Sequence, residues 1–584
     1  MDSMKKIFLI VIILIIPTLT WGQTYYMRAD GVAAKGAATA CNATSTAMSI
    51  TTHNATTFSP GDTIYLCGNG GDYKSTIRVP SSGSSGGGRI TYTAAPGHTP
   101  VVDLSVVVPN TGWTSLGGGI YQRSGYGRVF WEDNVPLNSA TTAACTDGNW
   151  FYAGGSNLLQ YKPTSGTPSD HSLRAVWWEI GSVGVGIDLR ERSYINISGI
   201  TFNRSGYGIG HGNVIGSAAG NVSNLSFYNN KFNQCLWAIW SQVNANYVES
   251  DVLIDKNTIN YCNSGISAWT NSEESGTQSQ YHTRYTITNN TISNMWSIVD
   301  GKTWTHAALQ SDNWDHEGIS FQDVQDSVIS GNTIHVADDK SFGGVDRLHT
   351  RGIFLYFTNG TVPTSGNTIT KNYITGHYRP AIFVDGAFGT GGGVENNTFS
   401  YNVIRYDGTN SDHIAFMYYV TQNNLKTGMN YFVNNVVYAN GGMGLYFASD
   451  YIAGNWKIQN NIIHSPIRAA STNANDNAHV LFSNNIYDNV SDTSGFQMMG
   501  GAITYAQWKA TYGQDLTGSR IENPLFISSS DFRLQSGSPA INAGVNVGLT
   551  TDYLGKAIVG LPDIGAYEYG SSRVPSAPVL LNIH

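Results

Sequence analysis

Charged side chains are scarce in this 584-residue chain: Lys, Arg, Asp and Glu together make up 12% of it, and the net charge is −8. The sequence also lacks clusters of basic residues. This charge pattern argues against a nucleic-acid partner, because contacts to a phosphate backbone need such clusters. Aromatic residues account for a further 12%, and low charge with many aromatics argues against disorder. The ligands that fit this composition best are neutral or weakly charged molecules.

Long apolar runs are missing too, except at the start of the chain. Residues 1–22 hold a basic stretch, MDSMKK, then an apolar run of about 15 residues, IFLIVIILIIPTLTW, and a small residue, which is typical of a secretory signal peptide. The run is shorter than the roughly 20 residues that cross a bilayer, which favours cleavage near Gln23 over an uncleaved anchor. We expect a secreted or periplasmic protein with no membrane span after cleavage.

Cysteines number only five, and none of their spacings resembles a zinc site. Cys41 and Cys67 flank the first predicted turns and could pair in an oxidising compartment. Cys235 and Cys262 lie 27 residues apart at the same place in successive repeats. That spacing is compatible with a disulfide or with two buried thiols. Cys145 is left over.

Helical periodicity is absent from the middle of the chain, and a repeat takes its place. Asn followed two positions later by Ile, Val, Phe or Tyr recurs at intervals of 24 to 42 residues. The repeated Asn residues are Asn230, Asn257, Asn290, Asn332, Asn372, Asn402, Asn435, Asn461 and Asn485. Gly-Ile segments such as HEGISFQD and TRGIFLYF alternate with them. Their anchors are Ile209, Ile239, Ile266, Ile319, Ile353, Ile382, Ile414 and Leu445.

Short β-rich segments broken by Gly and Asn at a regular period indicate that each repeat is one coil of a β-solenoid. The recurrent Asn has a physical reason. At a sharp corner an inward Asn tolerates left-handed backbone angles. Its amide can hydrogen-bond to the Asn of the coils above and below, which forms a ladder. We therefore predict an all-β fold whose coils stack in register.

This alternation of Asn-x-Ile and Gly-Ile segments resembles the right-handed parallel β-helix repeats of the pectate-lyase-like superfamily. SPGDTIYLCGNGGDYKSTIRV is similar to the first coils of secreted members such as the chondroitinase and alginate lyase group. DFRLQSGSPAINAGVNVG and DIGAYEY are similar to a C-terminal segment of bacterial β-helix proteins. The resemblance covers residues from about 58 to 569 and implies a right-handed parallel β-helix of the polysaccharide lyase type. It is weak for the reaction, because a fold does not fix function.

The domain organisation follows from this interpretation. After the signal peptide at 1–22 we expect an N-terminal cap at 23–60 and the parallel β-helix at 61–500. An antiparallel insertion rich in alternating aromatics is expected around 115–190. Residues 501–570 are expected to close the far end, with a short helix at ITYAQWKATYG, and 571–584 to form a tail. A capped solenoid can remain a monomer, which is the state we expect.

Alternation along a strand predicts which side chains face outward. If each anchor points inward, the residues one and three positions before and after it point out. Outward aromatic rings on consecutive coils suit the C–H-rich faces of sugars, and we place a polysaccharide site on the Gly-Ile strands between 209 and 446. The candidate substrate-binding residues are Trp240, Trp269, Phe354, Tyr356, Phe383 and Tyr446. The alternative is that flanking loops merely cover these rings.

Charged residues gather within the same region, which is unusual in a chain so poor in charge. Either they form a surface ion-pair network or they carry catalysis. The candidate catalytic residues are Arg351, Arg379, His316, His413, Glu317 and Asp385. His211, at an inward position, is expected to be buried and hydrogen-bonded instead.

Two chemistries fit these residues. A lyase removes the proton α to a uronic acid carboxylate, which needs a cation and a base. The cation is an Arg or calcium, with Glu317, Asp323 and Asp385 as candidate ligands. Related lyases use a Lys–Arg pair, and the outward positions hold no Lys. The base would then be His316, His413 or Tyr356.

An inverting glycoside hydrolase needs two carboxyl groups instead, and Glu317 with Asp385 could supply them. The strings NTD and DD of the polygalacturonase-like members are missing from these strands. A third possibility is a non-catalytic glycan-binding solenoid, which would keep the aromatic rings without the charged cluster. The sequence favours a lyase, then a hydrolase, then a binding protein. It does not identify the polysaccharide or distinguish endo from exo action.

Overall fold

The computed structural model describes residues 22–571, except 125–128, 140–144, 154–157, 177–183, 213–219, 245, 271–279, 296–315, 337–349, 358–361, 377–378, 387–392, 409–412, 421–426, 449–453, 473–477 and 499. Apart from Gly22 and Ser571, the predicted signal peptide and tail lie outside this range. Within it, no helix has the length and apolar character that a membrane crossing needs.

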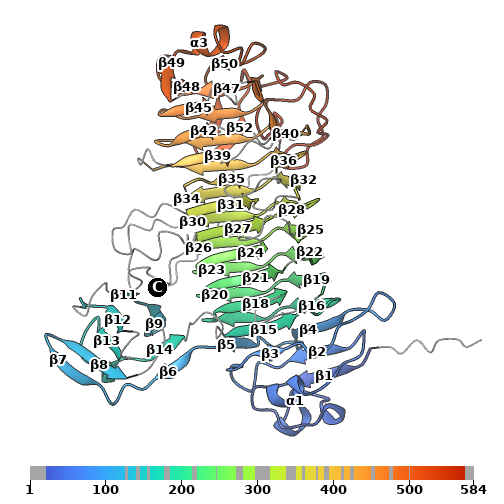
Figure 1. Ribbon diagram of the computed structural model, residues 1–584, viewed down its shortest axis with the longest axis vertical. Helices are drawn as coiled ribbons and strands as arrows, with labels where there is room; N and C mark the ends of the chain where they lie inside the picture. The colour runs from blue at the N-terminus through green and yellow to red at the C-terminus, as the bar shows by residue number, and fades with distance from the viewer. Residues whose placement is uncertain are drawn as a thin grey trace, which may run out of the picture.

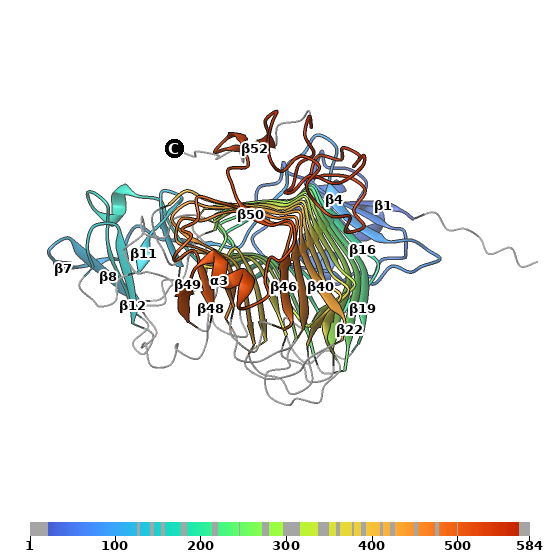
Figure 2. The ribbon, with the colours of Figure 1, turned by 90° about the horizontal axis from the view of Figure 1, so that it is seen from above.

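Parallel strands stack into three long sheets, and each full coil of chain contributes one strand to each sheet (Figure 1). Seen along the axis, the sheets form three walls around a closed interior (Figure 2). We call them sheets A, B and C in the order in which the chain meets them in a regular coil. This arrangement confirms the right-handed parallel β-helix that the sequence predicts.

The strands of each sheet follow in stacking order. Sheet A holds β1 (Thr24–Met27), β2 (Thr63–Leu66), β4 (Ile90–Ala94), β16 (Ile195–Ser198), β19 (Val222–Tyr228), β22 (Val248–Asp255), β25 (Tyr281–Thr288), β29 (Val328–Ser330), β33 (Thr368–Thr370), β37 (Thr398–Ser400), β40 (Met429–Val433), β43 (Asn455–Gln459) and β46 (Val480–Ser483), with β28 (Val324–Gln325), β32 (Thr364–Ser365) and β36 (Val394–Glu395) beside them. Sheet B holds β5 (Val101–Asp103), β17 (Thr201–Asn203), β20 (Lys231–Asn233), β23 (Thr258–Asn260), β26 (Thr291–Met295), β30 (Thr333–Val336), β34 (Tyr373–Gly376), β38 (Val403–Tyr406), β41 (Val436–Ala439), β44 (Ile462–His464), β47 (Ile486–Asp488) and β50 (Arg520–Ile521). Sheet C holds β3 (Ile77–Arg78), β15 (Val185–Arg190), β18 (Tyr207–Gly212), β21 (Trp237–Val243), β24 (Ser264–Thr270), β27 (His316–Gln322), β31 (Thr350–Tyr356), β35 (Ile382–Gly386), β39 (Ile414–Val420), β42 (Met443–Phe447), β45 (Arg468–Thr472), β48 (Phe496–Met498) and β49 (Gly501–Ile503).

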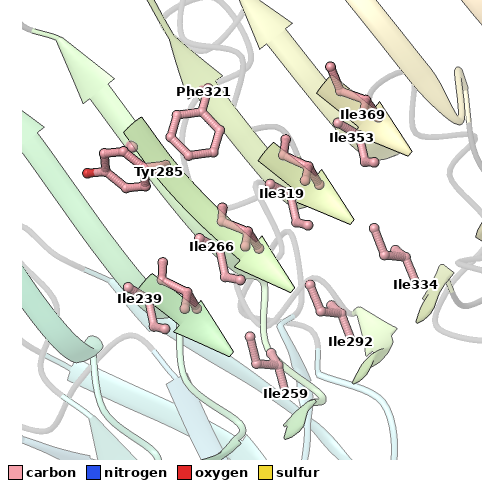
Figure 3. Packing of buried hydrophobic residues seen from close by; sticks show 14 of the residues in the cluster. Ile239, Ile259, Ile266, Tyr285, Ile292, Ile319, Phe321, Ile334, Ile353 and Ile369 are labelled. Carbon is pink, nitrogen blue, oxygen red and sulfur yellow. The ribbon is translucent and has the colours of Figure 1, made fainter. Parts of the chain in front are cut away.

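Columns of apolar side chains fill the interior of the solenoid. Ile239, Ile266, Ile319 and Ile353 stand one above another on sheet C, because each pairs with the next in register. Figure 3 shows them facing the Ile column of sheet B that includes Ile292. All are buried, and each fully buried Ile contributes about 1.5–3 kcal/mol of transfer free energy. The predicted anchors of the Gly-Ile strands therefore form one wall of the core.

The Asn ladder is present as predicted, from Asn230 to Asn485. In each step the Asn Nδ2 donates to the Oδ1 of the Asn in the next coil, at 3.0–3.2 Å. The expectation about backbone angles was wrong by one residue. The left-handed φ belongs to the residue before each ladder Asn, such as Lys371 (φ 56°) and Tyr401 (φ 56°). The corner therefore bends one position earlier, and the ladder Asn keeps its amide aligned with the stack.

The two ends of the solenoid are closed by different means. At the N-terminal end, β1 already pairs with β2 in sheet A, and α1 (Ile50–Asn54) lies beyond it. At the other end α3 (Tyr505–Ala510) buries Trp508 against Phe482 and Phe496 of the last coils. Both ends thereby cover the apolar interior, as an open stack of strands requires.

The segment after α3 does not stay at the end of the solenoid. It includes β51 (Phe526–Ser528) and β52 (Asp531–Leu534) and packs on the outer face of sheet B. Phe532, for example, lies 5.2 Å from the ring of Tyr438. Only the first part of the region that we predicted to cap the solenoid therefore does so.

Between β5 and β15 the chain leaves the solenoid to form an antiparallel unit, seen in cyan beside it in Figure 1. One of its sheets comprises β10 (Val135–Pro136), β9 (Val129–Glu132), β14 (Leu173–Val176) and β6 (Val106–Val108). The other comprises β11 (Asn138–Ser139), β12 (Asn149–Ala153), β13 (Leu158–Lys162), β8 (Ile120–Ser124) and β7 (Thr114–Gly117). It has its own core around Phe130 and Tyr161, and Arg204 of the solenoid donates to Asn134 at 2.7 Å.

The cysteines resolve the alternatives that the sequence left open. Cys41 and Cys67 form a disulfide, with Cα atoms 5.6 Å apart. Cys235 and Cys262 are buried free thiols in successive coils, and Cys145 is also free and buried. Burial raises the pKa of the Cys262 thiol well above its usual value, so it serves as a small core residue.

Candidate functional site

The outer face of sheet C carries the candidate site. Ile319, Ile353 and Ile382 pair in register, which aligns the residues that follow them in outward columns. Phe354 and Phe383 share one such column, and Tyr356 and Asp385 share the next. The outward positions predicted after each anchor are therefore those that the structure shows.

Before each anchor the alternation is interrupted by a small residue. A Cβ on Gly318 would lie 2.8 Å from Ile334 Cγ2 and 2.5 Å from the Gly352 carbonyl oxygen, so this position faces the interior. The pairing of β27 with β31 accordingly skips Gly318. The residue one position earlier is turned outward as a result. This places Glu317 and Arg351 on the outer face, where simple alternation would have put them inside.

Arg351 lies over two outward rings. Its Cζ is 4.0 Å from the centroid of Phe354 and 4.9 Å from that of Phe383. Both rings are buried, and they stack on each other with centroids 5.3 Å apart. A guanidinium over desolvated rings gains about 2 kcal/mol of cation–π attraction. The contact fixes the direction in which Arg351 extends.

Glu317 is the ionic partner of Arg351. Arg351 Nη1 donates to Glu317 Oε1 at 3.0 Å, and the side chains are only 5% and 2% exposed. Burial raises the pKa of Glu317, and the guanidinium offsets part of that rise. A buried ion pair is weak evidence for stability, since desolvation cancels much of the attraction. Such a pair in an aromatic surface is instead a mark of a functional site.

Asp385 is the second acid of the site. Burial raises its pKa to about 7, although Arg351 and the Gly386 N–H act in the opposite direction. Its Oδ1 is buried and has no hydrogen-bond partner among the described residues. A carboxyl group with an unused buried oxygen is poised to hold a proton at neutral pH. Asp385 is therefore the described group best suited to general acid catalysis here.

Aromatic rings extend from this centre toward the N-terminal end of sheet C. Phe354, Tyr356 and Phe383 form a cluster, against which Trp269 and Met417 pack. Trp269 lies 6.1 Å from Tyr356, and Trp240 stacks on Trp269 at 6.3 Å. Five of the six predicted binding aromatics are thus joined by ring contacts. Tyr446 lies in the column of Phe383, beyond Met417, with no ring contact to the others among the described residues.

Of the other proposed catalytic residues, His413 is turned away from this centre. His413 stacks on Tyr406, a core residue at the end of β38, with ring centroids 3.9 Å apart. It therefore faces the corner between sheets B and C. Arg379 lies three residues before Ile382, and its backbone N–H donates to the Thr350 carbonyl at 2.6 Å. His316 pairs with Thr350 on the neighbouring strand, and its side chain lies outside the described residues.

The pairing of β39 with its neighbours also corrects one predicted anchor. Ile382 pairs with Phe416, and Phe416 with Leu445, so Phe416 and not Ile414 continues the inward column. Ala415 takes the position of the small residue before the anchor. Ile414 then lies two residues before the anchor, the position that Arg351 takes in its own strand. The sequence placed the anchor two residues too early. A shift of two keeps the same inward and outward alternation, so the pattern itself did not reveal the error.

The predicted metal ligands are not brought together. Asp323 is fully buried at the corner after β27, where it accepts a hydrogen bond from Thr270 Oγ1 at 2.7 Å. Glu317 is held by Arg351, and the three carboxylates do not form a group of metal-ligating atoms among the described residues. The described structure therefore gives no support to the grouping of Glu317, Asp323 and Asp385 as ligands. Calcium dependence stays a prediction without a described site.

The described part of the chain holds one such group elsewhere, Glu132, Asp133 and His171 in the inserted unit. Its atoms already have partners. His171 Nδ1 lies 2.8 Å from Asp133 Oδ2, and Nε2 lies 2.8 Å from the Ser165 carbonyl oxygen. Tyr161 donates to Glu132. Because a carbonyl and a carboxylate both require donors, the ring is a charged imidazolium, and the group is a hydrogen-bonded brace.

Two aromatic residues of sheet C were missed by the sequence count. Tyr207 and Trp237 stand in the column of Arg351, and their rings stack with centroids 5.1 Å apart. Alternation alone assigned that column to the interior. The signal that could have found them is the small residue before each anchor, as in YGI, WAI and RGI. His211, in contrast, is buried as expected and hydrogen-bonds Glu249.

Comparison with known proteins agrees with this architecture. No family model matches the sequence, and no curated protein matches it. Among solved structures, XylC in complex with xylose aligns over 94% of this chain and 99% of that chain, with a TM-score of 0.55 and 12% identity. The chain has the parallel β-helix fold. At this level of identity the likeness shows the fold alone.

Two further solved structures are similar at lower scores. Pectate lyase Pel9A covers 95% of this chain and 98% of its own, with a TM-score of 0.34 and 14% identity. PfbA, a surface adhesin of Streptococcus pneumoniae, covers 68% of this chain and 83% of its own, with a TM-score of 0.33 and 12% identity. These scores are too low to bear on function.

Proposed function

We propose that this β-helix protein is a polysaccharide-degrading enzyme whose catalytic centre is Glu317, Arg351 and Asp385 on the outer face of sheet C. One observation carries the proposal. Glu317 forms a buried ion pair with Arg351, which extends over the aromatic cluster, and the charge of Arg351 also acts on the buried carboxyl group of Asp385. A glycan-binding protein would need the rings but would have no use for two costly buried acids.

Hydrolysis is the reaction that these residues suit best. Asp385, protonated up to about pH 7, would donate a proton to the leaving glycosidic oxygen. Glu317, which the guanidinium holds closer to its ionised form, would accept a proton from the attacking water. Arg351 extends from the column of Glu317 across Phe354 and acts on the charge of both acids. An inverting enzyme uses two such carboxyl groups, about 6.5–9.5 Å apart, with the attacking water between them.

A lyase acting by β-elimination on a uronic acid polymer is the second candidate. Arg379 lies just before β35, one coil after Arg351, and its backbone N–H donates to the Thr350 carbonyl. A guanidinium could neutralise a substrate carboxylate, after which Tyr356, on the same strand as Arg351, would act as the base. Against this, Arg351 is already neutralised by Glu317. We therefore place the lyase second and reverse the order favoured by the sequence.

The proposed enzyme acts outside the cytoplasm. The Cys41–Cys67 disulfide supports an oxidising compartment, and the predicted signal peptide gives a route to it. A polymer too large to enter a cell is a natural substrate for such a protein.

Product analysis tests the function directly. The purified protein is incubated with xylan, glucan and mannan, and in parallel with pectate, alginate, chondroitin and hyaluronan. New reducing ends without ultraviolet absorbance of an unsaturated product would support hydrolysis. Reducing ends with that absorbance would establish the lyase. Binding without any new ends from every polymer would contradict the enzymatic proposal.

The pH dependence of kcat/KM follows from Asp385. Its pKa is raised to about 7, so the carboxyl is protonated below that pH and ionised above it. Since hydrolysis needs the protonated form, activity on a neutral glycan should fall as the pH rises through about 7. The longer side chain in Asp385→Glu changes the environment of the acid. The pH at which kcat/KM falls should therefore change in this variant. If kcat/KM of Asp385→Glu falls at the same pH as that of the native protein, the fall reports the ionisation of another group.

A further inference from the structure

The aromatic surface of sheet C extends beyond the proposed catalytic centre toward the N-terminal end of the solenoid. Tyr207, Trp237, Trp240 and Trp269, from β18, β21 and β24, form this extension, and we call it the tryptophan platform. Trp240 lies 5.7 Å from Tyr207 and 5.1 Å from Trp237. Trp269 continues the surface at 6.3 Å from Trp240. The four rings thus make one connected patch.

The small residues before each anchor explain why the rings gather here. Gly208 and Ala238 turn Tyr207 and Trp237 outward, beside the column that holds Trp240. Trp237 is 7% exposed, while Tyr207, Trp240 and Trp269 are half-buried. Trp237 is therefore a buried residue against which Tyr207 and Trp240 pack, while the other three rings stay partly accessible to a ligand. Large aromatic rings left partly accessible in one patch mark a binding surface.

The charge of these strands points to the kind of ligand. β18, β21 and β24 contain no Lys, Arg, Asp or Glu. A glycan that carries a carboxylate on each sugar would find no cation on this part of the sheet. The apolar C–H faces of neutral sugar rings, in contrast, fit the electron-rich faces of the indoles. The described side chains therefore favour an uncharged ligand.

The platform is continuous with the catalytic centre. Trp269 is 6.1 Å from Tyr356, which belongs to the aromatic cluster under Arg351. Trp237 and Arg351 share a column but lie three strands apart, about 14 Å along the axis at the usual strand spacing. One extended chain lying along the axis could therefore occupy both surfaces at once, with several sugar rings between its ends.

We propose that the tryptophan platform is a distal binding subsite for neutral sugar units of a glycan chain that reaches the Arg351 centre. This proposal rests on the proposed function in taking a glycan as the ligand, and it goes further in assigning the ligand's charge and direction. Binding there adds affinity only for chains long enough to span the gap. The platform thereby makes the protein select long, uncharged glycans.

The experiment is a titration followed by intrinsic tryptophan fluorescence. Neutral xylo-, cello- and manno-oligosaccharides of increasing length are compared with oligogalacturonates of the same lengths. We expect Kd for the native protein to fall with the length of a neutral oligosaccharide. In Trp240→Ala the longest chains should bind about tenfold more weakly, while the shortest should bind as they do to the native protein. Kinetically, KM for long chains should rise and kcat should stay unchanged.

Matched variants separate this role from a loss of folding. Trp240→Phe keeps a ring and should restore most of the affinity. Tyr569→Ala removes a 43% exposed ring of the C-terminal segment, which packs away from sheet C, and should change nothing. Equal binding of every length by Trp240→Ala and the native protein would overturn the proposal. Tighter binding of oligogalacturonates, or no binding of any neutral chain, would do so too.

The outcomes also distinguish this proposal from the enzymatic one. If long neutral chains bind through Trp240 but no polymer is cleaved, the platform stands and the proposed catalysis fails. If a polymer is cleaved and Trp240→Ala retains the native KM for every chain length, the catalysis stands and the platform fails.

Discussion

Asp385→Asn is expected to lower kcat by about 10²- to 10⁴-fold, the usual contribution of a positioned general acid. The amide keeps the shape of the side chain but cannot donate an acidic proton to the leaving oxygen. Because burial disfavours the ionised carboxylate, the neutral amide should leave the protein at least as stable as the native form above pH 7. Initial rates on the cleaved polymer and thermal unfolding at pH 8 measure the two effects together.

Companion variants show whether the loss is specific. Glu317→Gln should reduce kcat by a similar factor, since it removes the group proposed to activate water. Asp407→Asn changes an exposed carboxylate of the β38 edge that pairs with Arg405, and should retain native activity. If Asp385→Asn keeps more than half of the native kcat, Asp385 is not the acid. Equal losses in Asp385→Asn and Asp407→Asn would indicate a general effect of charge.

Asn402→Ala is expected to produce the largest loss of stability. The Asn402 amide donates to the Ile369 carbonyl at 2.9 Å and to Asn435 Oδ1 at 3.0 Å. Its Oδ1 accepts from the Asn372 backbone N–H and from the Asn372 side chain. Truncation leaves these buried groups without partners, at about 1–3 kcal/mol each. We expect the free energy of unfolding to fall by roughly 3–5 kcal/mol in total, allowing for partial relaxation.

Denaturant unfolding of Asn402→Ala and of a matched control measures this loss. Asn440→Ala removes an exposed amide one coil corner away and should change the free energy of unfolding by no more than about 0.5 kcal/mol. Because each coil contacts only its neighbours, hydrogen exchange in Asn402→Ala should accelerate first in β34, β38 and β41. Uniform acceleration along the whole solenoid would contradict a ladder that acts locally.

The repeat made most of this fold predictable. Asn at a sharp corner and Ile at the centre of a strand return in phase, and only stacked coils satisfy both at every repeat. The interior columns at Ile319 and Ile353 and the ladder at Asn402 follow from that pattern alone. The disulfide between Cys41 and Cys67 was open to prediction for a different reason, since both lie beside early turns in a chain with few cysteines.

The errors in assigning side chains to the inner or outer face arose because strict alternation along each strand was assumed. Gly318, Gly352 and Ala381 break the alternation, so the residues two positions before each anchor face outward. Pattern counting that assumes an unbroken strand cannot find Tyr207 or Trp237, although the small residue itself is visible in every repeat. The same oversight chose Ile414 over Phe416. His413 was assigned to the outer face because unbroken alternation from either anchor points it outward, while its ring stacks on Tyr406.

Side-chain chemistry was harder to anticipate than position. Sequence placed Glu317, Arg351 and Asp385 near one another, but it could not show that Arg351 pairs with Glu317 and not with Asp385. Nor could it show that Asp323, at the end of the same strand, turns toward Thr270 at the corner. These choices depend on burial and on neighbours from other coils. They decide between a metal site, a lyase and a hydrolase.

A crystal structure of the Asp385→Asn protein with a long neutral oligosaccharide tests the central claim most directly. The variant keeps the binding surface while slowing turnover, so an intact chain should be seen. The chain is predicted to lie along the outer face of sheet C, with a glycosidic oxygen within hydrogen-bond reach of residue 385 and sugar rings on Trp240 and Trp269. A ligand bound on sheet A or B, or on the inserted unit, would contradict the account.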